Sequence, residues 1–94
     1  MGRDGKYVVA YDLRDDSERE KVARILQGFG SRVQKSVFEC RLSVGMRARL
    51  AARLQALELA SGGVLVYRLN DRSRAIAIGD CPGYADEEPF AHVL

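Results

Sequence analysis

Residues 7–20 read YVVAYDLRDDSERE, and this stretch decides how the fold begins. Its first half is almost continuously apolar and rich in β-branched and aromatic side chains, which predicts a strand over residues 6–12 in the middle of a sheet. The polar residues that follow indicate a turn. Ser17 and Glu20 then form the S-x-x-E capping pattern, which satisfies free backbone amides where a helix starts. A buried strand, a turn and a helix are therefore expected in this order.

The rest of the chain continues this alternation of strands and helices. Apolar residues at helical spacing follow the capping pattern, and Gly30 is expected to end this helix in the left-handed conformation. Residues 33–42 are expected to be extended. Because neither face of this segment is cleanly apolar, a bulge or a break into two strands is expected near Ser36. A second helix, ended by residues 61–63, is marked by the apolar stripe Met46, Leu50, Leu54 and Leu57.

Two more strands are expected, over residues 64–69 and 73–78. The order strand, helix, one or two strands, helix and strand, followed by a late strand, is the ferredoxin-like split βαβ pattern. It gives an α+β fold with two helices on one face of an antiparallel sheet. Residues 1–79 are predicted to form this βαββαβ domain with its additional strand. Residues 80–94 are predicted to be a tail or a strand that pairs with a partner.

The face of such a sheet that carries no helices is left uncovered. The simplest cover for an exposed apolar sheet face is the same face of a second copy. A domain of 94 residues also buries only ~60–65% of its unfolded surface, so dimerisation would add stability. We therefore expect a homodimer that packs through its sheet faces.

Composition limits the classes of protein to which the chain can belong. Charged residues make up 30% and hydrophobic residues 47%, which is the balance of a folded globular domain. No apolar stretch approaches the ~20 residues that a bilayer span needs, and no signal-peptide pattern opens the chain. Cys40 and Cys81 have the spacing of neither a metal site nor a redox motif. A soluble, cytoplasmic protein without membrane contact is expected.

Arginine dominates the basic residues. The chain has 12 Arg and 3 Lys, although its formal net charge is only +2. The planar guanidinium group suits phosphate, so this bias is consistent with contact to a nucleic-acid backbone. A GC-rich genome or a thermophilic source would produce the same bias, and the sequence leaves both explanations open.

Two segments together are characteristic of one family. The first holds Tyr11-Asp12-Leu13 and Asp15-Asp16, followed by Arg19, Val22 and Gly30; the second is Arg32-Val33-Gln34 with Ser36-Val37-Phe38-Glu39. With these residues the chain resembles the CRISPR-associated protein 2 family, the CRISPR-associated endoribonucleases of the spacer-acquisition module, over roughly residues 6–79. Either segment alone is a weak signal, whereas the combination is fairly specific.

The resemblance implies a homodimer in which Asp12 of each copy approaches the other across the two-fold axis. The two carboxylates are then expected to share one Mg²⁺ ion, with Mn²⁺ as a substitute, that activates water against a phosphodiester bond of RNA or DNA. The resemblance also implies that a late strand near residues 75–78 adds to the partner's sheet, and that the dimer works with the CRISPR integrase protein. By resemblance, Asp12 is the catalytic and metal-binding residue, and the nucleic-acid-binding residues are Tyr11, Arg19, Arg32 and Phe38.

Each of these residues also has a purely structural interpretation. Magnesium is usually held by one or two carboxylates, waters and substrate phosphates, so a single Asp12 is marginal and two across a symmetry axis would suffice. Alternatively, Asp12 caps a turn or bonds backbone amides. Tyr11 alternates with Asp12 and is expected to point to the opposite face of the strand, where it could pack in the core. Phe38 could do the same, and Arg19 and Arg32 could be ordinary solvated arginines.

Three functions follow from these alternatives. The first is a metal-dependent endonuclease, and the second is a non-catalytic scaffold that holds DNA and bridges two dimers of the CRISPR integrase. The third is a ferredoxin-like regulator that binds a small ligand. The sequence offers no Ser-His-Asp or Cys-His triad, no P-loop and no Rossmann glycine pattern. It does not choose between RNA and DNA, because contacts to the backbone carry no base code.

Overall fold

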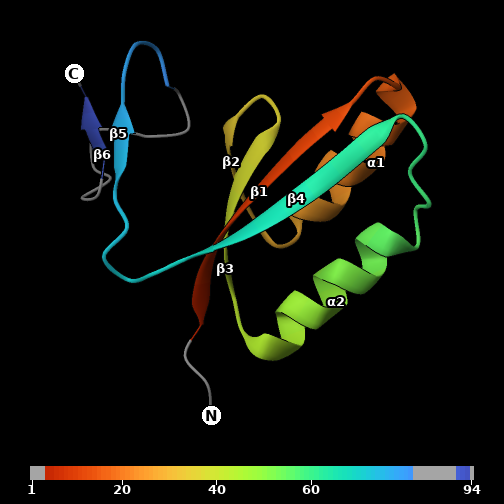
Figure 1. Ribbon diagram of the computed structural model, residues 1–94, viewed down its shortest axis with the longest axis horizontal. Helices are drawn as coiled ribbons and strands as arrows, with labels where there is room; N and C mark the ends of the chain where they lie inside the picture. The colour runs from red at the N-terminus through yellow and green to blue at the C-terminus, as the bar shows by residue number, and fades with distance from the viewer. Residues whose placement is uncertain (1–3, 82–90, 94) are drawn as a thin grey trace.

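The computed structural model describes residues 4–81 and 91–93. Its elements are β1 (Gly5–Leu13), α1 (Asp16–Gln27), β2 (Gly30–Gln34), β3 (Val37–Leu42), α2 (Val44–Gln55), β4 (Gly62–Leu69), β5 (Ala75–Ala77) and β6 (Ala91–Val93). The first six elements follow the predicted βαββαβ order, and the two short strands β5 and β6 come after them (Figure 1).

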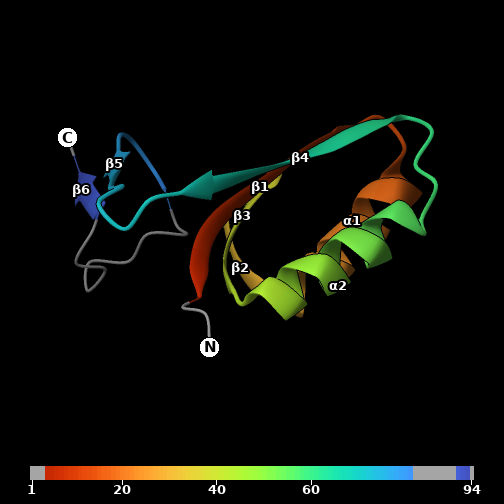
Figure 2. The same ribbon diagram turned by 60° about the horizontal axis from the view of Figure 1, so that its bottom comes forward.

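The sheet has four strands in the order β2-β3-β1-β4, and every neighbouring pair is antiparallel. β1 is therefore a central strand, as its apolar character predicted. Both helices lie on one side of the sheet, and the other side carries no helix (Figure 2). We call that second side the open face. The predicted ferredoxin-like α+β fold is confirmed.

The core lies between the sheet and the two helices. Along β1 the burial alternates, so that Tyr7, Val9, Tyr11 and Leu13 are buried against the helices. Phe38 of β3 is fully buried in the same layer. This alternation follows from the pleat, which turns successive side chains to opposite faces. Residues 6, 8, 10 and 12 consequently lie on the open face, where the first three are half-buried and Asp12 is exposed.

The start of α1 differs from the prediction. Asp15, not Ser17, is the N-cap, and its Oδ1 accepts a hydrogen bond of 2.8 Å from the backbone N–H of Ser17. The S-x-x-E interpretation was wrong because an aspartate two residues earlier already supplies a good capping oxygen. Gly28 ends the helix in the right-handed conformation with φ −80°, so the expectation of a left-handed cap at Gly30 was also wrong.

Gly30 is needed for a different reason. It begins β2 opposite Cys40, and a Cβ atom there would lie 2.2 Å from the backbone oxygen of Glu39. The break predicted near Ser36 is confirmed, because β2 and β3 form a hairpin that turns at residues 35–36 and has an irregular register between Arg32 and Gln34.

The second helix ends earlier than predicted. α2 stops at Gln55, and Leu57 packs on the core from outside the helix. Shortly afterwards Glu58 has φ 52°, a left-handed backbone conformation that a helix cannot continue through. Ser61 therefore precedes β4, and Gly62 and Gly63 are its first two residues, so these three residues do not end the helix.

The late strand lies outside the four-stranded sheet. β5 pairs in parallel with β6 in a separate two-stranded sheet, with Ala75 opposite Ala91 (Figure 1). Part of the predicted tail, residues 91–93, is thus a strand that pairs within the chain, while residues 82–90 and 94 lie outside the described residues. The domain boundary at residue 79 and the addition of this strand to a partner's sheet stay predictions. Within the described ranges, neither helix is both long and apolar enough to cross a membrane.

Candidate functional site

Asp12 lies near the end of β1 on the open face. Tyr11 and Leu13, its neighbours in sequence, are buried on the opposite face. In residues 4–81 and 91–93 the structure gives the Asp12 side chain no hydrogen-bond or ion-pair partner. The alternative in which Asp12 caps a turn or bonds backbone amides therefore has no support in these residues. A rigid strand presents this carboxylate to solvent.

Two glycines of β4 shape the surroundings of Asp12. Gly63 is its register partner, and a Cβ atom at Gly63 would meet no atom within 4 Å. At Gly62 the backbone is much closer, because a Cβ atom there would lie 1.8 Å from the backbone oxygen of Asp12. The pair therefore leaves space beside the carboxylate and brings the main chain of β4 tightly against the main chain of β1.

Glu18 of α1 connects this strand end to the segment before β4. Its carboxylate accepts hydrogen bonds from the backbone N–H of Ala60 at 2.8 Å and of Ser61 at 2.9 Å, and from the Ser61 hydroxyl at 2.5 Å. The Ser61 hydroxyl bond, followed by the two backbone bonds, holds the pKa of Glu18 below its ordinary value of 4.5. Sequence reasoning missed this contact because Glu18 and Ser61 are 43 positions apart.

Arg19 is engaged within the fold. Its Nη1 donates a hydrogen bond of 2.5 Å to the backbone oxygen of Leu13, and its other terminal nitrogen forms an ion pair with Asp16. The side chain is half-buried. The predicted contact of Arg19 with phosphate stays a prediction, and it would compete with this ion pair.

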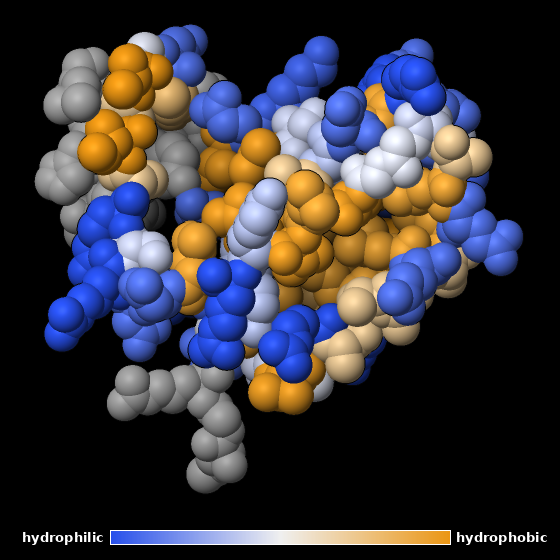
Figure 3. Space-filling model, viewed as in Figure 1, coloured by the Kyte–Doolittle hydropathy of each residue, from blue (hydrophilic) through white to orange (hydrophobic). Residues whose placement is uncertain are grey.

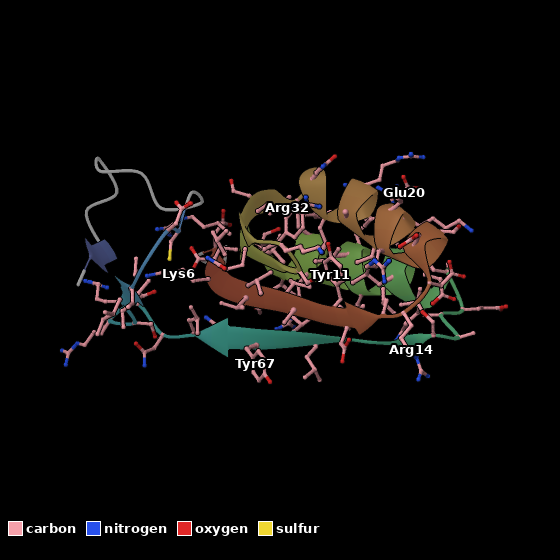
Figure 4. All side chains as sticks on the ribbon, turned by 90° about the horizontal axis from the view of Figure 1, so that it is seen from above. Lys6, Tyr11, Arg14, Glu20, Arg32 and Tyr67 are labelled. Carbon is pink, nitrogen blue, oxygen red and sulfur yellow. The ribbon has the colours of Figure 1, made fainter. Side chains whose placement is uncertain are left out.

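The other three predicted nucleic-acid residues form one group on the helix side of the sheet. The rings of Tyr11 and Phe38 are stacked with centroids 6.5 Å apart, and the guanidinium of Arg32 lies 5.2 Å from the centroid of Phe38. Tyr11 and Phe38 are buried, so their rings serve the core, whereas Arg32 is exposed at the edge strand β2. Figure 4 shows Tyr11 directed toward the helices and Tyr67 directed away from them. The structure thus separates these three residues from Asp12.

The open face carries apolar side chains that are accessible in the single chain. Leu65 is 60% exposed and Tyr67 is 53% exposed. In register, Ala10 lies between Val37 and Leu65, and Val8 lies beside Tyr67. Figure 3 shows hydrophobic residues gathered along β4 on the face turned to the viewer. The order of helices and strands predicted an uncovered sheet face, but the sequence analysis did not name the residues that form it.

Asp12 has the chemistry of a metal ligand but is not part of a ready-made group of ligands. A carboxylate oxygen that is free of other partners is the kind of ligand that Mg²⁺ prefers. The part of the chain that the structure describes contains no group of three or more Asp, Glu, His or Cys side chains placed to hold an ion. Among the described residues, Asp12 is thus a single candidate ligand, and a divalent cation bound there would need further ligands from water, a phosphate group or another chain.

The fold and the site define a small ferredoxin-like α+β domain with one free strand-end carboxylate and an uncovered sheet face. The family model for CRISPR associated protein Cas2 matches residues 6–76, which include Asp12 and all of the four-stranded sheet from its second residue onward. The chain belongs to this family.

Two curated relatives illustrate the match. The chain is 51% identical over 51 residues to CRISPR-associated endoribonuclease Cas2 3 of Synechocystis, and the aligned part covers 54% of the chain and 55% of that relative. It is 36% identical over 77 residues to CRISPR-associated endonuclease Cas2 2 of Thermus thermophilus, covering 81% of the chain and 86% of that relative. The chain thus spans about half the length of the first relative and most of the second.

Two solved structures share the fold. A hypothetical protein from Thermus thermophilus, TT1823, superposes with a TM-score of 0.75 at 34% identity, covering 84% of the chain and 95% of that protein. A chain of a partial Cas6-RT-Cas1–Cas2 complex superposes with a TM-score of 0.57 at 28% identity, covering 71% of the chain and 80% of that chain.

Proposed function

We propose that two copies of this chain form a metal-dependent endonuclease that acts on RNA or DNA phosphodiester bonds in CRISPR spacer acquisition. The observation that carries this proposal is the exposed carboxylate of Asp12, which has no partner among the described residues of its own chain. Two relatives bear the names endoribonuclease and endonuclease, which supports the reaction class.

The metal site is proposed to consist of Asp12 from both copies. One Mg²⁺ ion, or Mn²⁺ in its place, would supply an acidified water and screen the charge of the phosphate. Without an ion, two carboxylates close to each other would repel. Each copy would supply one of the two carboxylates of the site. The rigid strand β1 fixes Asp12, and the missing side chain at Gly63 leaves room beside it for a phosphate group.

The dimer is proposed to form through the open face. Leu65 and Tyr67 project from this face, and together with Val8, Ala10 and Val37 they make a continuous apolar surface beside Asp12. Pairing this surface with itself across a two-fold axis would remove it from water and bring the two Asp12 side chains toward each other.

We expect Leu65→Asp to convert the dimer into monomers. A carboxylate in the centre of an apolar interface loses its hydration without gaining a partner, which should weaken association by about 100-fold or more. Size-exclusion chromatography with light scattering, run over a range of protein concentrations, measures this change directly.

Val44→Asp is the matched control for that substitution. Val44 is 64% exposed and is the first residue of α2, where an acidic side chain is favourable at the helix N-terminus. The control should dimerise like the original chain. A Leu65→Asp variant that still dimerises would show that the open face is not the interface.

Nucleic acid is proposed to contact the dimer through its phosphate backbone. Arg32 is exposed on the edge strand β2 and is available for such a contact, although its guanidinium also lies over the ring of Phe38. Neither Tyr11 nor Phe38 presents a ring to solvent, so stacking of bases on these residues is not part of the proposal. Contacts of this kind would make binding strongly dependent on salt and indifferent to sequence.

A non-catalytic scaffold that bridges CRISPR integrase dimers is a second candidate function. The similar chain in the Cas6-RT-Cas1–Cas2 complex favours it, because that structure holds a fold of this kind within an assembly. The scaffold requires the same dimer and the same backbone contacts, and it differs in having no need for Asp12.

Metal removal distinguishes the two functions. We expect the purified full chain to cut labelled RNA or DNA in Mg²⁺ or Mn²⁺ and to lose this activity in excess chelator, because in the proposed site the ion would acidify the attacking water. Nucleic-acid binding, measured by fluorescence anisotropy in the same buffers, should persist in chelator. Binding without any cleavage in either metal would favour the scaffold over the nuclease.

A further inference from the structure

Two adjacent residues of α1 hold the two backbone segments that flank Asp12. Arg19 donates its hydrogen bond to the backbone oxygen of Leu13, directly after Asp12 on β1. Glu18 binds Ala60 and Ser61, directly before the glycines of β4 that lie against Asp12. The first turn of one helix therefore reaches both strands at the place where the candidate carboxylate is presented.

We propose that Glu18 and Ser61 are positioning residues that fix the backbone of Asp12 against β4 and so hold its carboxylate where a shared divalent cation can bind. This inference rests on the proposed function, because it assigns a role toward the same Asp12 site. Neither side chain is proposed to touch the ion.

Ser61 links α1 to the residues between β1 and α1. Its hydroxyl donates to Glu18 at 2.5 Å and accepts from the backbone N–H of Arg14 at 3.1 Å and of Asp15 at 3.0 Å. Its backbone oxygen accepts a further bond of 3.3 Å from Arg14. Ser61, which precedes β4, is thus hydrogen-bonded to the residues that follow β1. Its hydroxyl donates one hydrogen bond and accepts two, which is all that a hydroxyl group can make.

The hydrogen bonds of Ser61 affect Asp12 because Gly62, the residue after Ser61, contacts the backbone of Asp12. The backbone of Gly62 approaches the backbone oxygen of Asp12 so closely that no Cβ atom fits between them. A displacement of Ser61 must move Gly62, and Gly62 cannot move without shifting Asp12 or breaking the pairing of β1 with β4. When the backbone of a strand end is held in this way, its carboxylate occupies a narrower range of positions and is already close to the geometry that binds an ion.

The charge of Glu18 contributes to the same arrangement. An ionised carboxylate accepts hydrogen bonds only, and Glu18 accepts three from two consecutive residues of the loop before β4. Asp16 and Arg19 neutralise each other on the adjacent part of the helix. The Glu18 carboxylate bonds to the loop before β4 and not to Arg19.

The test is the affinity of the full chain for Mn²⁺, measured by calorimetric titration below the melting temperature of every variant. Ser61→Ala should weaken binding about tenfold, as loss of an indirect supporting contact does at metal sites. Ser61→Thr keeps the hydroxyl and should bind like the original chain. Glu18→Gln retains the size of the side chain but loses one acceptor oxygen, and it should weaken binding in the same direction as Ser61→Ala.

A destabilised control separates positioning from general stability. Leu50→Val trims a buried core residue of α2, and it should lower the melting temperature without changing the Mn²⁺ affinity. If Leu50→Val weakens binding as much as Ser61→Ala does, the effect is one of stability and the positioning role is wrong.

Asp12→Ala separates this inference from the proposed function. Loss of Mn²⁺ binding in Asp12→Ala, with unchanged binding in Ser61→Ala and Glu18→Gln, would overturn the positioning role and leave the proposed site intact. Equal Mn²⁺ affinity of Asp12→Ala and the original chain would overturn the proposed site itself, and the positioning role with it.

Discussion

Replacing Asp12 with alanine is expected to reduce metal-dependent cleavage by about 10³-fold or more while leaving the protein folded. In the proposed site this carboxylate is the ligand that each copy contributes to the ion, and the loss of several kcal/mol of metal-assisted stabilisation corresponds to a rate change of this size. Asp12 is exposed and bonds to no described residue, so the free energy of unfolding should change by no more than about 0.5 kcal/mol. Single-turnover cleavage in Mg²⁺, together with thermal unfolding, measures both quantities.

Asp4 provides a matched control for this experiment. It is also an exposed aspartate, but it precedes β1, so it lies at the opposite end of the strand from Asp12. Asp4→Ala removes the same charge from the chain and should leave cleavage unchanged. If Asp12→Ala retained full cleavage, the nuclease would have to use another group, and the scaffold function would become the better explanation of a free carboxylate.

Replacing Gly62 with alanine is expected to destabilise the fold by about 3 kcal/mol or more, because the added methyl group has no space. The new Cβ atom would lie 1.8 Å from the backbone oxygen of Asp12 and 2.9 Å from its carbonyl carbon. These are main-chain atoms of a central strand, so they cannot turn aside as a flexible side chain does. Thermal unfolding at a fixed protein concentration should show a fall in Tm of at least about 10 °C.

Gly63→Ala is the control that isolates the steric cause. Gly63 is the next residue of the same strand, and a Cβ atom there meets nothing within 4 Å. The substitution should be neutral, or stabilise the protein by about 0.5 kcal/mol through a less flexible unfolded chain. Equal losses of stability for the two substitutions would mean that strand conformation, and not the close approach to Asp12, makes these glycines necessary.

Local patterns in the sequence predicted most of the fold. The apolar run of residues 6–12, the uneven faces of residues 33–42 and the stripe on the second helix gave the element order, the central strand and the break near Ser36. These features depend on the period of a strand or a helix, which is set by backbone geometry and is visible within a few residues. The helix ends were less accurate, because Asp15 and Ser17 are both good capping residues and only the folded backbone selects one.

The candidate site was predictable only in part. The position of Asp12 at a strand end and the opposite orientation of Tyr11 both follow from alternation along one strand. The use of Arg19 to bind Leu13, and the stacking of Tyr11 on Phe38, depend on which elements meet after folding. An arginine in a sequence has the same charge whether it is free for phosphate or engaged with a carbonyl oxygen, so its role could not be assigned from the sequence.

By itself, the amino-acid sequence determined the family, the α+β architecture and the strand that carries Asp12, because each is encoded in short-range spacing and in the residues of two local segments. Only the tertiary structure decided which polar groups are already occupied. Glu18 finds Ser61 and Gly62 meets Asp12 across long separations in sequence, and such contacts arise when the chain closes into a sheet. A free carboxylate is defined by the absence of such contacts, and that absence becomes visible only once the neighbours of Asp12 are in place.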